Sequence, residues 1–138
     1  MVPVTYRYLT CNEIRNLLDN ASYCLLGVSN NDPNNPSEDN QPYVVPMLYC
    51  YTQSNGTYTF ILYSYDEGQK WDYFLSNQKI CLEFNWRNSD GVKSVIAQGT
   101  ASYERVQSCV NNNRQLMKIT LTTSDVTGRK YYNLNALS

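Results

Sequence analysis

Gly68 and Lys70 lie between a predicted strand and a short predicted helix, where they could hold an anion. A lysine that opens a helix lies beside unpaired backbone N–H groups and the positive end of the helix dipole, which suits a dianionic phosphate. A glycine two residues earlier lets the backbone approach such a group closely. The alternative is that Lys70 is a solvated surface lysine that binds nothing.

The sequence contains no histidine, and this narrows the chemistry that its side chains can perform. Ser-His-Asp triads, Cys-His pairs and histidine-bearing zinc sites are excluded. Catalysis would have to come from carboxylates, tyrosines, cysteines, lysines, backbone groups or a bound cofactor. The sequence therefore identifies no catalytic residue and predicts no metal site.

Charge and cysteine usage restrict the partners and the compartment. The 138 residues carry a formal net charge of −1, and the basic residues form no stripe, so neither nucleic acid nor a membrane surface is a predicted partner. The five cysteines form no C-x-x-C pair, which argues against a thiolate metal site. An odd cysteine count without a secretory signal or a long apolar run predicts a cytoplasmic protein with reduced, buried thiols.

The first half of the chain predicts a capped helix followed by strands. Thr10-Cys11-Asn12-Glu13 is a capping-box pattern that opens a one-sided helix ending near Asn20. Asn55-Gly56 predicts a tight hairpin turn. Pro42 and Pro46 place the second strand at a sheet edge or in a bulge. The predicted strands cover residues 23–29, 41–51, 57–64, 79–86 and 92–104.

Later segments add helices to this pattern. We predict a short helix over Gln69–Ser76 and another over Val106–Ile119, with residues 120–138 forming either a strand or a helix. The whole chain, 1–138, is predicted to be a single domain with its core in residues 10–104 and a C-terminal helix and tail in residues 105–138. Strands with hairpin punctuation and short peripheral helices indicate a small antiparallel barrel.

The order of motifs carries a family resemblance. Pro42-Tyr43-Val44-Val45-Pro46-Met47 is followed by Phe60-Ile61-Leu62-Tyr63-Ser64, then by Gly68-Gln69-Lys70-Trp71-Asp72 and Ile80-Cys81-Leu82-Glu83-Phe84. This order resembles the pyridoxamine 5′-phosphate oxidase-like FMN-binding split barrels, and most closely their small nitroimidazole-resistance-protein-like members. The resemblance implies a mainly β fold: a six-stranded antiparallel split β-barrel with short peripheral helices. It also implies a homodimer with FMN in two clefts along the subunit interface.

The resemblance also implies which residues contact the cofactor. Ser64 and Lys70 would hold the phosphate, and Gln69 stands where pyridoxamine-oxidising members have an arginine. The second strand would lie against the isoalloxazine ring, and Gln98 would reach it across the interface. The complete set of expected cofactor-binding residues is Val44, Val45, Pro46, Met47, Tyr63, Ser64, Gln69, Lys70 and Gln98.

We therefore expect an FMN-binding flavoprotein that acts as a small oxidoreductase or flavin reductase on an unidentified small molecule, with the flavin carrying the electron or hydride transfer. Vitamin B6 oxidation is not favoured, because the basic residues of the second strand are missing. One alternative is a non-catalytic module of the same fold that holds haem or a deazaflavin. Another is a structural or interaction protein that keeps the dimer, has lost cofactor binding and uses its tyrosine-rich surface for partners, with Ser64 only ending a strand.

Overall fold

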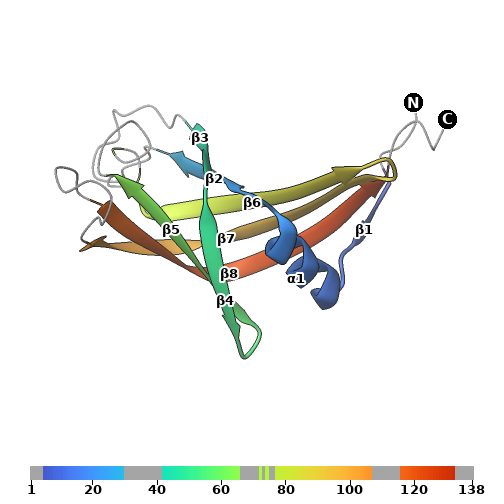
Figure 1. Cartoon of the computed structure of the whole chain (residues 1–138), viewed down its shortest axis with the longest axis horizontal. Helices are drawn as coiled ribbons and strands as arrows, with labels where there is room; N and C mark the ends of the chain where they lie inside the picture. Colours follow the sequence, from blue (N-terminus) through green and yellow to red (C-terminus); the bar gives the residue numbers. More distant parts are fainter. Residues whose placement is uncertain are drawn as a thin grey trace.

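Figure 1 presents a computed structural model of the chain, in which helix α1 packs against an eight-stranded antiparallel sheet. The structure describes residues 5–29, 42–65, 72, 74, 77–106 and 116–132. Its elements are β1 (Tyr6–Tyr8), α1 (Cys11–Asn20), β2 (Cys24–Ser29), β3 (Pro42–Met47), β4 (Tyr49–Ser54), β5 (Thr57–Tyr65), β6 (Lys79–Asn88), β7 (Gly91–Val106) and β8 (Leu116–Tyr132).

The sheet is closed by one nearly continuous stretch of chain. Its strand order is β3-β2-β6-β7-β8-β5-β4, with β1 paired to β8. β3 and β4 are thus at opposite ends of the path, yet only Leu48 separates them in the sequence. Because β3 pairs with β2 and β4 pairs with β5, this stretch joins the two margins of the sheet into a split barrel.

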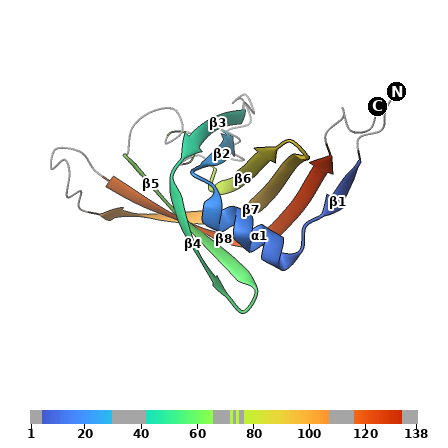
Figure 2. The same ribbon diagram turned by 45° about the vertical axis from the view of Figure 1, so that its right-hand side comes forward.

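Local sequence explains α1. The Thr10 hydroxyl accepts a hydrogen bond from the Glu13 N–H, and the Glu13 carboxylate accepts one from the Thr10 N–H, as the capping box predicts. Leu17 and Leu18 are the buried residues of the helix, and α1 lies across the face of the long strands (Figure 2). Gly128 makes this approach possible, because a Cβ there would lie 2.8 Å from Ile14 Cγ1.

Alternation along the strands builds the core. Every second residue is buried along β5 and along the first half of β6 as far as Phe84, with the neighbours facing outward. Phe60 and Phe84 meet at the centre, with ring centroids 5.0 Å apart. The buried residues that surround them are Leu26, Leu62, Leu82, Val95, Ala97, Met117, Ile119 and Leu121.

The C-terminal segment differs from the prediction. The helix predicted over Val106–Ile119 is wrong from Leu116 onward, because those residues begin the 17-residue strand β8. Met117, Ile119 and Leu121 are buried at alternate positions, and β8 pairs with β5 and β7 on its two sides. The sheet consequently has eight strands, where the resemblance implied six.

Pro42 and Pro46 lie in the edge strand β3, and β3 has no bulge, which was the other predicted possibility. β3 pairs with β2 in unbroken register from Pro42 to Met47 and is an end strand of the sheet. The irregular register instead falls between Gln98 and Gly99, opposite Ser124. An edge strand tolerates proline because the missing N–H is not needed for pairing.

The expectation of buried cysteines is correct only in part. Cys24 is buried, but Cys11 and Cys50 are exposed and Cys81 is intermediate. Cys109 lies outside the described residues. Of the predicted helix Gln69–Ser76, only Asp72 and Phe74 are described; both are helical, and Phe74 is buried. No helix in the described ranges has the length and hydropathy to span a bilayer.

Candidate functional site

A mainly apolar pocket lies where the β3–β4 junction meets β5. It has a volume of about 370 Å³. Three of the expected cofactor-binding residues line it: Pro46 and Met47 from the end of β3, and Tyr63 from β5. Its other lining residues are Leu48, Tyr49 and Cys50. Ligand sites in proteins are typically apolar concavities of this kind.

The side chains of β3 alternate between the two faces of the strand. Val45 packs against the core and Met47 is buried, whereas Val44 is 60% exposed and Pro46 is exposed. Since a proline in a strand sits where its nitrogen faces away from the neighbour, the backbone groups of Val44, which has the same parity, face the open edge. β3 therefore offers an apolar surface beside backbone hydrogen-bonding groups.

Tyr63 and Ser64 are placed on opposite sides of β5. Tyr63 is half exposed and faces the pocket. Ser64 is buried on the core side, and its hydroxyl donates a hydrogen bond to the Tyr65 carbonyl at 2.9 Å. Ser64 is thus not part of the pocket that Tyr63 lines, and a ligand that touched both would have to pass around the end of the strand.

Gln98 lies far from this pocket within the same chain. Tyr63 pairs with Lys118 of β8, and Gln98 pairs with Asp125 of the same strand. These two β8 residues are seven positions apart, which at about 3.3 Å per residue separates Tyr63 from Gln98 by roughly 20 Å. One isoalloxazine ring cannot contact both residues of a single chain.

A second depression, of about 340 Å³, surrounds Gln98 on the outer face of β7 and β8. Arg129 lines it, with its guanidinium carbon 4.8 Å from the centre of the Tyr6 ring. The Arg129 Nε is buried and has no hydrogen-bond partner in the structure, which leaves a donor beside the depression.

The expected phosphate-binding residues Gln69 and Lys70 lie outside the described residues, as does Gly68. Ser64 lies close to that segment in the sequence, since β5 ends at Tyr65. Of the expected set, the structure brings together Pro46, Met47 and Tyr63, and it separates them from Gln98.

Sequence reasoning missed Leu48, Tyr49 and Cys50 as lining residues. No pattern within the sequence identifies them, because the chain changes its pairing partner at Leu48 and residues on both sides of this junction approach one hollow only in the closed barrel. Leu48 is 76% exposed, which is unusual for a large apolar side chain at a sheet junction.

The described residues that line the pocket carry no charged side chain, and one of their two hydroxyl groups is already engaged. The Tyr49 hydroxyl donates to the Leu18 carbonyl, and burial raises the pKa of Tyr49 to about 12. Nowhere in the described ranges do three or more cysteine or acidic side chains gather so as to hold a metal ion. The arrangement suits a flat, mostly apolar ligand.

Comparison with known proteins gives structural matches alone. No protein-family model matches the chain, and no curated protein matches it. Among solved structures, it is similar to a candidate 5-nitroimidazole antibiotic resistance protein from Bacteroides thetaiotaomicron, with a TM-score of 0.72 and 16% identity over 94% of this chain and 89% of that one.

Two further structures have the same fold. A candidate pyridoxamine 5′-phosphate oxidase from Corynebacterium glutamicum matches with a TM-score of 0.62 and 11% identity over 92% of this chain and 94% of that one. An FAD-binding protein from Mycobacterium smegmatis matches with a TM-score of 0.60 and 15% identity over 91% and 98% of the two chains. At these identities the likeness establishes the fold.

Proposed function

This chain has the fold of the pyridoxamine 5′-phosphate oxidase-like split barrels, and on that premise we propose that it binds FMN and acts as a small oxidoreductase or flavin reductase. The observation that carries the proposal is the apolar pocket in which Pro46, Met47 and Tyr63 meet. One of the proteins of this fold is described as FAD-binding, which supports a flavin-type ligand.

The residues present fit a flavin ring. Met47 and Leu48 supply apolar surface that would exclude water from one side of the ring, and the half-exposed Tyr63 supplies an aromatic face for offset stacking. The backbone groups of Val44 at the open edge of β3 would meet the polar rim of the ring. These groups orient a ligand without any charged side chain.

The flavin would supply the electron or hydride transfer, as such cofactors do. The chain's own residues would bind and orient it. Tyr49 is not an available proton donor, since its hydroxyl is already used by the Leu18 carbonyl. The proposed role of the protein is therefore positioning and water exclusion, and it needs no histidine.

The site would be complete only in a homodimer. The β8 residues that pair with Gln98 and with Tyr63 are roughly 20 Å apart, so Gln98 would contact the flavin bound by the other chain. Val44, Leu48 and Tyr63 are exposed apolar side chains at or beside the pocket, and a second copy would cover them. The proposed site thus combines the β3–β5 pocket of one protomer with Gln98 of the partner subunit.

Titration of the cofactor-free protein with FMN and with riboflavin, which lacks the phosphate, tests the proposal. We expect FMN fluorescence to be quenched on binding, and Tyr63→Ala to weaken the binding of both ligands. Lys70→Ala should weaken FMN at least tenfold, or about 1.4 kcal/mol, while leaving riboflavin unchanged. A protein that takes up neither ligand would contradict the proposal, and uptake of haem or a deazaflavin in their place would favour a non-catalytic module.

A further inference from the structure

A third pocket lies between α1 and the β6–β7 hairpin, and it shares no residue with the β3–β5 pocket. It has a volume of about 220 Å³ and is open on one side. Helix α1 contributes one wall and the paired ends of β6 and β7 the other. Its lining residues are Glu13, Asn16, Leu17, Asn20, Trp86, Asn88 and Lys93.

Trp86 forms an aromatic surface in this pocket without serving the core. Phe84, two residues earlier on the same face of β6, is fully buried, whereas Trp86 is 49% exposed. Among the residues that the structure describes, the Trp86 ring has neither an aromatic contact nor a hydrogen-bond partner. An indole in this state exposes a large apolar face that a flat ring could cover.

Lys93 lies beside Trp86, and its ammonium group lacks a close hydrogen-bond acceptor among the described residues. The two residues are direct cross-strand partners in β6 and β7, so their Cβ atoms are about 5 Å apart and their side chains share one face. The Lys93 side chain is only 27% exposed, and its ion contact among the described residues is Glu13 Oε2 at 3.9 Å. That separation is too long for a hydrogen bond.

The Glu13 carboxylate is already used by other donors. Arg7 donates to both of its oxygens at 2.8 Å, and the Thr10 N–H donates to Oε1 at 3.0 Å. Lys93 and Glu13 are the charged lining residues of the pocket, and Arg7 and the Thr10 N–H already occupy the Glu13 carboxylate. An anionic group would therefore complete the hydrogen bonding of the Lys93 ammonium.

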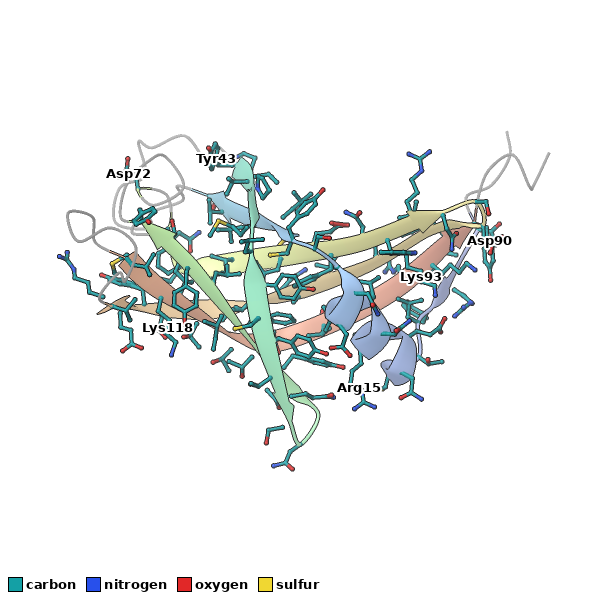
Figure 3. The ribbon with its side chains drawn as sticks, viewed as in Figure 1. Arg15, Tyr43, Asp72, Asp90, Lys93 and Lys118 are labelled. Carbon is teal, nitrogen blue, oxygen red and sulfur yellow. The ribbon has the colours of Figure 1, made fainter. Side chains whose placement is uncertain are left out.

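From this arrangement we propose that the pocket binds a small aromatic carboxylate, whose ring covers Trp86 and whose carboxylate accepts from Lys93 Nζ. The volume is sufficient for a single ring with its acid group. The amide side chains of Asn16, Asn20 and Asn88 form the rim and favour a ligand with a polar edge. Lys93 and the β6–β7 turn at Asp90 lie at one end of the molecule (Figure 3).

Benzoate and benzamide provide the test, because they have nearly the same shape and differ in charge. Calorimetric titration of the full chain should show benzoate binding at least tenfold more tightly than benzamide. The indole N–H resonance of Trp86, assigned with Trp86→Phe, should shift with both ligands at saturation. Lys93→Met should bring the affinity for benzoate down to that for benzamide and leave benzamide unchanged.

Lys118→Met is the matched control. Lys118 is a lysine of similar exposure with its own carboxylate, Glu104 at 3.6 Å, and it lies at the far end of the sheet (Figure 3). This variant should bind benzoate as the parent protein does. Equal affinity for the two ligands, no shift of the Trp86 resonance, or unchanged benzoate binding in Lys93→Met with native circular dichroism would each overturn the proposal.

Discussion

The Tyr51 hydroxyl on β4 donates a hydrogen bond of 2.5 Å to the Asp19 carboxylate near the end of α1. Burial, together with this carboxylate, raises the pKa of Tyr51. Tyr49, two residues earlier on the same face of β4, donates to the Leu18 carbonyl. The C-terminal turn of α1 is thus attached to the strand that closes the barrel.

Tyr51→Phe should lower the free energy of unfolding by about 1 to 2 kcal/mol, because it leaves the Asp19 carboxylate without this donor. Urea denaturation measures the change. A double-mutant cycle with Asp19→Ala provides the control, since the two substitutions should be less than additive. Strict additivity would show that the contact contributes nothing to stability.

The lowered pKa of Glu13 implies that the free energy of unfolding depends on pH. Hydrogen bonds from Arg7 and then from the Thr10 N–H lower the pKa of Glu13 from 4.5 to about 2. Because the pKa is depressed in the folded state, the stabilisation is present above about pH 4.5 and is lost as the pH falls towards 2. The stability difference between the parent protein and Glu13→Gln should therefore shrink across that interval.

Denaturation curves at pH 7, 4 and 2 measure this difference. Glu104→Gln is the control, because Glu104 is 65% exposed beside Lys118 and should contribute little at any pH. A difference for Glu13→Gln that stays constant between pH 7 and pH 2 would contradict the assignment.

Gly99 is predicted to tolerate no side chain. A Cβ at this position would lie 2.3 Å from the Thr122 carbonyl oxygen, at the irregular register opposite Ser124. Gly99→Ala should lower the free energy of unfolding by about 1 to 3 kcal/mol, because backbone must move. Gly27→Ala is the matched control: its Cβ would meet Cys81 at an ordinary 3.5 Å and should be nearly neutral. Equal effects of the two substitutions would be the contrary result.

Local patterns predicted the parts of the fold that depend on a few neighbouring residues. The capping box at Thr10 and the Asn55-Gly56 turn, where Asn55 has φ 53° and Gly56 φ 80°, are both where the sequence places them. The prediction covers β8 only in part, since it leaves residues 120–138 as either a strand or a helix and makes residues 116–119 helical. The partner strand β5 is distant in the sequence, so that pairing cannot be derived from a local pattern. The apolar residues Leu116, Met117 and Ile119 also suit a helix, although the three consecutive asparagines before them weaken it.

The same reasoning applies to the candidate site. Pro46 and Met47 could be inferred from a motif within one strand, but the separation of Gln98 from Tyr63 depends on strand order. The opposite facing of Tyr63 and Ser64 follows from strand alternation alone and could have been derived from the sequence. Leu48 could not, since its position matters only after the barrel closes.

Leu48→Glu should separate the proposed dimer. Leu48 is 76% exposed beside the apolar pocket, and a carboxylate there would oppose association with a second copy. Sedimentation velocity at micromolar concentration should show a monomer, together with weaker FMN binding. Ser54→Glu, at an exposed site near the end of β4, should leave the dimer intact. A parent protein that is itself monomeric would contradict the proposed dimer.

Cysteine labelling offers a further check on the pocket. Cys50 lines it and Cys11 does not, although both are exposed. Iodoacetamide at pH 8 should modify both, and FMN should protect Cys50 alone. Cys24 should stay unmodified until the protein unfolds, because burial raises its thiol pKa to about 12. Equal protection of Cys11 and Cys50 would indicate that FMN binds elsewhere.

The single residue between β3 and β4 has a mechanical consequence for the molecule. β3 is held by β2 and β4 by β5, so the first and last members of the sheet share one covalent tether at Leu48. Because only Leu48 separates them, the separation of β3 from β2 displaces the start of β4, and the separation of β4 from β5 displaces the end of β3. The barrel should consequently open at both margins in one concerted event, and amide hydrogens of β3 and β4 should exchange with solvent at matching rates.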